Sequence, residues 1–362
     1  MISAWLYEYI YLLLVTVLTL AQCLQYDRYS WSRVLNPAPQ RSIASILLVV
    51  FLTIFIGFRP ISHEFVDMVS YDRYYQFAFG EIFSFDWGTT DIVFDNLLHY
   101  CASLRWDVSI FFTIISAIYF GGMYIACRKM FPRDAFFALL VLLGAFSTFS
   151  YGVNGIRAGA AASIFLVAIA YRDKRWLSYL LMALSYGVHH SMQVLVIAYI
   201  IVSLLKNTKV YLWIWFFSLI ISSLHISSFQ ELLANYTDSF GVKYLLFDES
   251  DESVYLTGFR LDFILYSVVP ILMGYYCVFK RKVESERYRF IYNLYVLTNS
   301  VWLLCMYASY TNRIAYLSWQ LLPIVLIYPF LNERISAAQY KTGALVALGH
   351  LGFTLFIEFV YY

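Results

Sequence analysis

Residues 135–175 read AFFALLVLLGAFSTFSYGVNGIRAGAAASIFLVAIAYRDKR. Two long apolar runs flank the polar turn YGVNGIR at 151–157, and basic residues follow the second run. A helix needs about 20 mostly apolar residues to cross a bilayer, and such runs are the main signal of a membrane-spanning helix. We therefore read this stretch as two membrane helices near 135–151 and 157–171, joined by a polar turn.

The composition extends this reading to the whole chain. Of the 362 residues, 61% are hydrophobic, 20% are aromatic and 13% are charged, whereas soluble domains have about 25% charged residues. A chain of this length has room for about a dozen crossings and no soluble catalytic domain. We predict an all-α, polytopic integral membrane protein that forms one membrane domain over 1–362. The predicted spans lie near 4–24, 43–58, 108–126, 135–151, 157–171, 176–188, 191–205, 210–228, 261–279, 291–308, 314–331 and 342–361. Those between 157 and 188 are short, which suits re-entrant or broken helices.

Positive charge is sorted between the two sides of this predicted layout. Six short loops on one side hold 18 of the 25 Lys and Arg residues, and the positive-inside rule makes that side cytoplasmic. Both termini are then outside, and the first helix inserts without a cleavable signal. The seven exceptions on the outer side are Arg59, Arg73, Arg105, Arg157, Lys243, Arg260 and Arg313.

The outer side also holds the two long loops, at about 59–107 and 230–262. Long loops in compact proteins usually carry function, so we expect the site outside. The acidic run at 248–252 would suit a divalent cation or a solvated loop, and we predict no metal site. The five cysteines form no CxxC or His/Cys pairing, and nothing in the sequence predicts a cofactor.

The densest chemistry lies in the turn that opens the 157–171 helix. We expect Asn154 to cap this helix and Arg157 to lie on the same face within its first turn. A helix N-terminus attracts anions, and an arginine there adds a bidentate phosphate donor. We therefore predict a phosphate-binding site. An arginine that extends to lipid headgroups is the alternative.

A second motif, His189-His190-Ser191, lies at the outer end of the next hairpin. We expect Ser191 to cap the following helix. Histidine titrates near neutral pH, so either imidazole would serve as a general base or phosphate donor. A structural role at a helix end is the alternative for each.

Two further motifs complete the outer face. Asn312-Arg313 opens the eleventh span, and Tyr316, one turn later, is a further candidate for sugar binding. Arg59 precedes an acidic, aromatic segment in which carboxylates would bind sugar hydroxyls and flat rings would cover apolar sugar faces; its candidate residues are Asp67, Tyr71, Asp72, Tyr74 and Tyr75. Tyrosine also prefers the membrane interface, so an interfacial aromatic belt is the alternative.

The order of these motifs resembles the EpsG family of bacterial exopolysaccharide proteins, which is grouped with Wzy-type polysaccharide polymerases. The resemblance covers roughly residues 50–330. It rests on Arg59 with Asp67-x3-Tyr71, Asp91-Ile-Val-Phe94, Asn154-Gly-Ile-Arg157, His189-His190-Ser191 and Asn312-Arg313-Ile-Ala-Tyr316.

The resemblance implies a GT-C-like membrane glycosyltransferase on the outer face of the bacterial inner membrane, with periplasmic termini. Its donor would be a glycan on undecaprenyl pyrophosphate, and its acceptor a hydroxyl of a new lipid-linked repeat unit. Arg157 and Arg313, supported by Arg59, would bind the pyrophosphate beside Asn154 and Asn312. His189 or His190 would activate the acceptor, with Asp67 or Asp72 as competing bases. A lipid-open cleft would admit the lipid tails. Expected partners are membrane lipids and a chain-length regulator, with no nucleic acid and no metal.

Three other classes share parts of this pattern. A flippase or transporter of lipid-linked glycans would place its charges near the midplane rather than at outer helix ends. An O-antigen ligase-type transferase would use nearly the same arginines and histidines. A membrane acyltransferase would take its donor from the cytoplasm and place its chemistry on the inner face.

Overall fold

The computed structural model describes residues 2–26, 43–225, 258–308 and 311–361, and these residues form helices and turns without a β-strand. The all-α prediction is confirmed for this part of the chain. Lys243, the acidic run 248–252 and most of the predicted outer loop 230–262 lie outside the described residues. The described residues fall into two compact units, and the single membrane domain stays a prediction.

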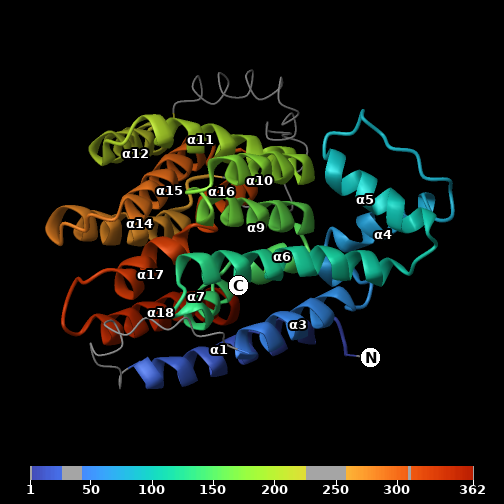
Figure 1. Ribbon diagram of the computed structural model, residues 1–362, viewed down its shortest axis with the longest axis horizontal. Helices are drawn as coiled ribbons and strands as arrows, with labels where there is room; N and C mark the ends of the chain where they lie inside the picture. The colour runs from blue at the N-terminus through green and yellow to red at the C-terminus, as the bar shows by residue number, and fades with distance from the viewer. Residues whose placement is uncertain (1, 27–42, 226–257, 309–310, 362) are drawn as a thin grey trace. The chain divides into compact units, whose positions relative to one another are not determined.

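The first unit comprises Met1–Gln193 and Phe330–Tyr362, and Figure 1 shows its helices from blue to green and in red. Its α-helices are α1 (Leu6–Tyr26), α3 (Ile43–Gly57), α4 (Met68–Phe77), α5 (Ile92–Ser103), α6 (Val108–Met130), α7 (Ala135–Leu143), α8 (Thr148–Val153), α9 (Ile156–Ala170), α10 (Arg175–Val188) and α18 (Gln339–Phe356). Short 3₁₀ turns lie at η1 (His63–Phe65) and η2 (His190–Met192), and a π-turn, η5 (Ile357–Tyr361), follows α18.

Helix α6 is the centre of this unit, because α3 and α9 both pack along it. Small residues permit the close approach: Gly122 of α6 faces Ser163 of α9, and the Ser163 hydroxyl donates to the carbonyl of Ile118 at 2.8 Å. Asp107 caps the start of α6 by accepting from the amide of Ser109 at 2.9 Å. The small-residue run after Arg157 therefore has the packing role that small residues usually have between membrane helices.

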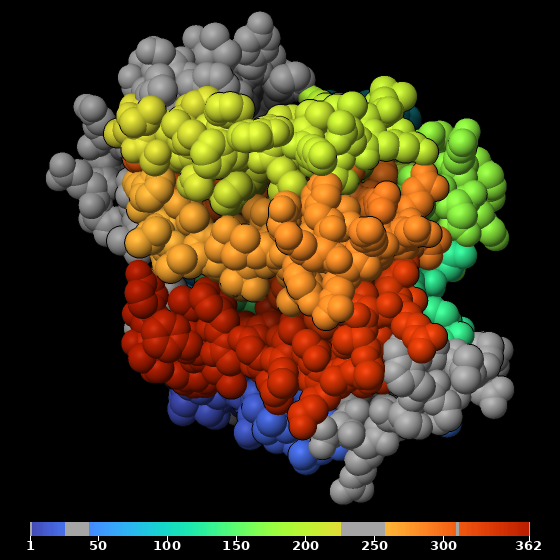
Figure 2. All heavy atoms as spheres, turned by 90° about the vertical axis from the view of Figure 1, so that its left-hand side faces the viewer, coloured from blue at the N-terminus to red at the C-terminus, as the bar shows by residue number. Residues whose placement is uncertain are grey.

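The second unit comprises Val194–Pro329. Its helices are α11 (Gln193–Leu204), α12 (Thr208–Ser223), α14 (Leu261–Tyr275), η4 (Tyr276–Lys280), α15 (Glu286–Leu304), α16 (Thr311–Trp319) and α17 (Leu322–Asn332), of which α11 begins and α17 ends just beyond the unit. Figure 2 shows the yellow-green surface of this unit closely packed on its orange surface. Asn299 of α15 links α12 to α16, because it accepts from Trp215 Nε1 at 2.8 Å and donates to Ser318 Oγ at 3.1 Å.

Every predicted apolar span coincides with a helix or with two consecutive helices. Five described helices are long and apolar enough to cross a membrane, and four shorter apolar helices accompany them, so the protein is membrane-embedded. Two predicted spans are broken: 135–151 at Gly144, between α7 and α8, and 314–331 at Gln320, between α16 and α17. The number of crossings, their orientation and the GT-C-like architecture stay predictions.

The predicted outer loop 59–107 is more ordered than expected, because it contains α4 and α5. These helices lie at the end of α6 where α6 begins (Figure 1). Buried Asn96 of α5 fixes the connection between them: it accepts from the amide of Asp86 at 2.8 Å and donates to the carbonyls of Asp86 and Ile92 at 2.8 and 2.7 Å. The α4–α5 connection is therefore a fixed element beside the candidate site.

Candidate active site

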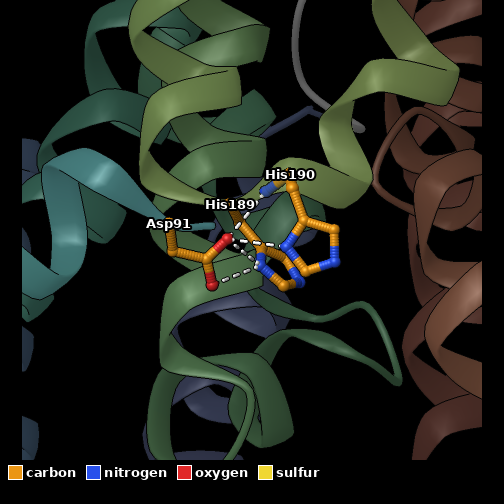
Figure 3. Close-up of side chains that lie close together, drawn as sticks. All are labelled: Asp91, His189 and His190. Carbon is orange, nitrogen blue, oxygen red and sulfur yellow. Dashed lines mark hydrogen bonds and ion pairs between the residues drawn. The ribbon is translucent and has the colours of Figure 1, made fainter. Parts of the chain in front are cut away.

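A buried carboxylate organises the candidate site. Asp91, just before α5, is completely shielded from solvent and accepts from both adjacent histidines (Figure 3). His190 Nδ1 lies 2.7 Å and its backbone amide 2.9 Å from Oδ1, and His189 Nδ1 lies 3.1 Å from Oδ2. Arg157 Nη1 also lies 2.8 Å from Oδ2. The structure thus brings together three of the site residues predicted from the sequence: Arg157, His189 and His190.

The contacts of Asp91 determine which imidazole nitrogens are available. An ionised carboxylate only accepts hydrogen bonds, so each histidine donates its Nδ1–H to Asp91 and its Nε2 is left as an acceptor. Burial opposes the ionised form of Asp91, but the hydrogen bonds from His189 and His190 outweigh it and hold the pKa of Asp91 well below its usual range. Burial also lowers the pKa of His189, despite the opposing effect of Asp91. This shift favours the neutral form of His189, whose Nε2 is left as an acceptor.

Close packing of α10 on α5 brings the histidines to Asp91. A Cβ atom on Gly187 would lie 2.8 Å from Cγ2 of Val93, so only glycine lets the end of α10 approach α5 this closely. The backbone of His189 is extended directly after α10, and His190 begins the η2 turn. Ser191 lies inside this turn, so the prediction that it caps the next helix was wrong.

Arg157 is the second residue of α9 and is held from two sides. Its Nε donates to the Tyr71 hydroxyl at 3.2 Å, and its guanidinium lies over the rings of Tyr71 and Phe94 at 5.5 and 5.7 Å. Its other terminal nitrogen has no hydrogen bond to a described residue, and 36% of the side chain is exposed. Arg157 is therefore fixed in place with donor capacity left for a ligand.

The start of α9 differs from the prediction for Asn154. Gly155 occupies the N-cap position without a side-chain cap, and the amide oxygen of Asn154 is buried without a hydrogen-bond partner among the described residues. The prediction that Asn154 caps the helix was wrong, because Asn154 ends α8 instead. The turn is tight, since a Cβ atom on Gly159 would lie 2.5 Å from the Tyr151 carbonyl oxygen.

A cavity of about 470 Å³ opens beside Arg157. It lies between α4 and α5, and the sugar-binding candidates Tyr71 and Tyr74 are in its wall. Its remaining lining is Phe77, Ala78, Glu81, Thr89, Phe94, Asp95, Leu98 and His99. Arg157 thus joins the Asp91 cluster to a cavity of the size that small-molecule sites usually have.

Other predicted residues in this unit have different contacts. Arg59 is buried and donates to the carbonyls of Ile56 and Val153 at 2.7 and 2.9 Å, so it ties α3 to the end of α8. Buried Tyr75 donates to the carbonyl of Trp106 at 3.0 Å. Asp72 accepts from Gln76 at 3.0 Å on its own helix.

Asp67 occupies the position before α4. The carboxylate that binds both histidines is Asp91. The roles of Asp67 and Asp72 as competing bases, and of Arg59 in pyrophosphate binding, stay predictions.

The remaining candidates belong to the second unit. Arg313 and Asn312 are exposed in the first turn of α16, and the Asn312 side chain accepts from the Arg313 amide at 3.0 Å. Tyr316 is buried, with its ring 5.7 Å from that of Trp319. The helix start predicted for Arg313 is confirmed, and its part in pyrophosphate binding stays a prediction.

Residues 42–362 match the profile of the EpsG family. The chain belongs to the EpsG family. The resemblance inferred from the motif order is confirmed, and the match includes every candidate site residue of both units. Membership suggests a polysaccharide polymerase of glycosyltransferase type. No curated protein and no solved structure matches the chain.

Three residues of this candidate site were not among the candidates predicted from the sequence: Asp91, Asp95 and His99. The available signal for Asp95 and His99 was their spacing, because residues four apart on a helix lie on one face. Asp91 was noted only as part of the family resemblance.

Asp91, His189 and His190 also form a set that a metal ion would suit, with one ligand atom from each within 4.8 Å of the others. The observed contacts favour a hydrogen-bond network, because both Nδ1 atoms already lie at hydrogen-bond distance from the carboxylate and Arg157 balances its charge. The prediction of no metal site remains to be tested by chelation.

Proposed function

We propose that the protein polymerises lipid-linked oligosaccharide repeat units on the outer face of the bacterial cytoplasmic membrane. The growing glycan on undecaprenyl pyrophosphate is the donor, and a hydroxyl of a new lipid-linked repeat is the acceptor. The observation that carries this proposal is the Asp91 cluster, in which two oriented imidazoles and a fixed arginine lie together. Family membership supports the same activity.

In this proposal one of the two histidines is the general base. Its Nε2 takes the proton of the acceptor hydroxyl, while the hydroxyl oxygen bonds to the anomeric carbon of the donor sugar. The buried Asp91 carboxylate keeps the imidazole in the required tautomer and stabilises its protonated form, as carboxylates do in other base dyads.

Arg157 acts on the leaving group. When the bond between the anomeric carbon and the phosphate oxygen breaks, the electron pair leaves with undecaprenyl pyrophosphate. The free terminal nitrogen of Arg157 is positioned to stabilise this charge, and preorganised electrostatic stabilisation is commonly the largest catalytic contribution. We propose Arg313 and Asn312 as further pyrophosphate contacts, and a chain-length regulator as a protein partner.

The proposal is tested with purified full-length protein and lipid-linked repeat units extracted from cells that lack it. A ladder of chain lengths on a gel, formed without nucleotide, is the expected result. Failure of the wild-type protein to extend the repeats would overturn the proposal, and so would ladders of normal length from the Asp91→Ala and Arg157→Ala variants. Repeating the assay with EDTA tests the prediction of no metal, which requires unchanged extension.

An O-antigen ligase-type transferase is the alternative that the same geometry favours. A ligase would transfer a preformed glycan to a different acceptor and would not extend the repeat units in this assay. Adding that acceptor in place of the second repeat unit separates the two activities.

A further inference from the structure

The cavity beside Arg157 has charged residues of both signs in its lining, which the proposed reaction leaves unexplained. Arg157 contributes a guanidinium, whereas Glu81 and Asp95 contribute carboxylates and His99 contributes an imidazole. A site for pyrophosphate alone would gain nothing from two carboxylates, because like charges repel. The lining therefore points to a ligand with an anionic part and a hydroxyl-bearing part.

Helix α5 places this chemistry in a regular order. Asp91 immediately precedes the helix, and Asp95 and His99 follow it within the helix at intervals of four residues, so Asp95 and His99 lie on one face. Asp91 contacts the histidines and Arg157, whereas Asp95 and His99 line the cavity. The Asp91 cluster thus lies at the start of α5, and the cavity lies along the same helix.

The opposite wall of the cavity comes from α4 and is aromatic. The Tyr71 hydroxyl accepts from Arg157 Nε at 3.2 Å, while Tyr74 and Phe77 are 62% and 74% exposed. Flat exposed rings beside carboxylates suit a sugar, since carboxylates accept from hydroxyls and rings cover the apolar face of the pyranose.

We infer that the α4–α5 cavity binds the sugar ring next to the pyrophosphate of the lipid-linked donor. Asp95 and His99 accept hydrogen bonds from its hydroxyls, Tyr74 and Phe77 cover its apolar face, and Arg157 holds the phosphate attached to it. This inference rests on the proposed polymerase activity and assigns its donor subsite.

The cavity is built before the ligand arrives. Asn96 fixes the connection between α4 and α5 by two hydrogen bonds of 2.8 Å with the backbone of Asp86. Gly80 has φ +78°, which favours glycine, and its amide donates to the carbonyl of Ala102 at 2.9 Å. A preformed wall reduces the entropy lost on binding, which is the usual origin of affinity in a rigid site.

The test measures KM and kcat for lipid-linked repeat extension by the full-length protein with Asp95→Asn, His99→Ala and Tyr74→Ala. A lost hydrogen bond or stacking surface in the ground state raises KM by about tenfold per variant and leaves kcat within about twofold. Tyr74→Phe keeps the ring and retains most of the affinity. Asp173→Asn, a surface carboxylate paired with Lys129 at 3.0 Å, is the acidic control and leaves both constants unchanged.

Direct binding distinguishes this inference from the proposed function. In an Asp91→Asn background, where turnover is slow, the extracted lipid-linked repeats still bind in a filter assay, and adding Asp95→Asn or Tyr74→Ala weakens that binding by about tenfold. Unchanged binding and KM in the cavity variants overturn the subsite while the polymerase activity stands. Loss of kcat alone in those variants also overturns it. Absence of wild-type extension overturns the proposed function instead.

Discussion

Replacing Asp91 by asparagine tests the centre of the site most directly. The side chain keeps its size, but the charge and one acceptor oxygen are lost. In the wild-type protein the Asp91 carboxylate accepts hydrogen bonds from Arg157, His189 and His190, and His190 donates through both its ring and its backbone amide. An asparagine NH₂ group pointing at an imidazole favours the opposite tautomer, so Nε2 carries the proton and no longer serves as a base.

The magnitude follows from the tautomer and from the charge. Wrong-tautomer substitutions in other acid–base dyads lower kcat by about 10⁴-fold, which corresponds to about 5 kcal/mol. Because a second imidazole and Arg157 remain in this site, we expect a fall of about 10²- to 10⁴-fold in kcat with KM within about threefold.

The assay is gel-resolved extension of extracted lipid-linked repeats by purified protein. Asp95→Asn, four residues later in α5, is the matched comparison, because it raises KM rather than lowering kcat. Melting temperature controls for folding: Arg157 is 36% exposed and is hydrated when its partner is lost, so the variant stays folded. Folded Asp91→Asn protein with wild-type kcat would refute the role of Asp91 in orienting the base.

Four further predictions concern the pH dependence of the wild-type protein and the residues Arg157, Gly187 and Arg59. Because the histidine base acts when neutral and burial lowers the pKa of His189 below 6.5, wild-type activity is retained as the pH falls to 6.5 and is lost below it, as a pH–rate profile will show. Arg157→Ala stops polymer formation and lets single lipid-linked repeats accumulate. Arg157→Gln removes a positive charge that lowers the pKa of His189, so the acid limb of the pH–rate profile of its residual activity moves to higher pH, whereas Arg157→Lys keeps the charge. Equal acid limbs in the Arg157→Gln and Arg157→Lys variants would contradict this coupling. Gly187→Ala forces α10 away from Val93 at a cost of about 1–3 kcal/mol and lowers activity, and the added substitution Val93→Ala restores it. Lack of rescue by the double variant would show that this contact does not position the histidines. Arg59→Ala lowers the melting temperature without changing KM, because its donors bind backbone carbonyls, and a raised KM in a stable variant would instead support pyrophosphate binding.

The sequence predicted the helices that are continuously apolar and missed the partly polar helices α4 and α5. The apolar runs located each span within a few residues, since continuous hydrophobicity is required for a helix in lipid. Helices α4 and α5 escaped because their polar faces interrupt the apolar run. The break at Gly144 was also invisible, because the sequence on both sides of it is apolar.

The candidate site was predictable in part for a similar reason. Arg157 and His189 begin and end the α9–α10 hairpin, so their nearness follows from the short turn between two helices. The partner carboxylate did not follow from the sequence, because it depends on the fit of α5 against Gly187. The expected asparagine cap failed because the chain places Gly155 at that position.

The rotation of α5 about its axis determines how the cavity residues Asp95 and His99 are oriented relative to Asp91, which contacts the histidines. Each step of four residues turns the side chain by about 40° beyond a full circle, at about 100° per residue. Asp95 and His99 therefore point in directions about 40° apart on one rigid helix, and Asp91 lies immediately before its first residue. Inserting one residue in the first turn of α5, before Asp95, would turn Asp95 and His99 by about 100° relative to Asp91. Relatives that differ in the sugar they polymerise should therefore vary the residues corresponding to Asp95 and His99 while keeping this interval unchanged.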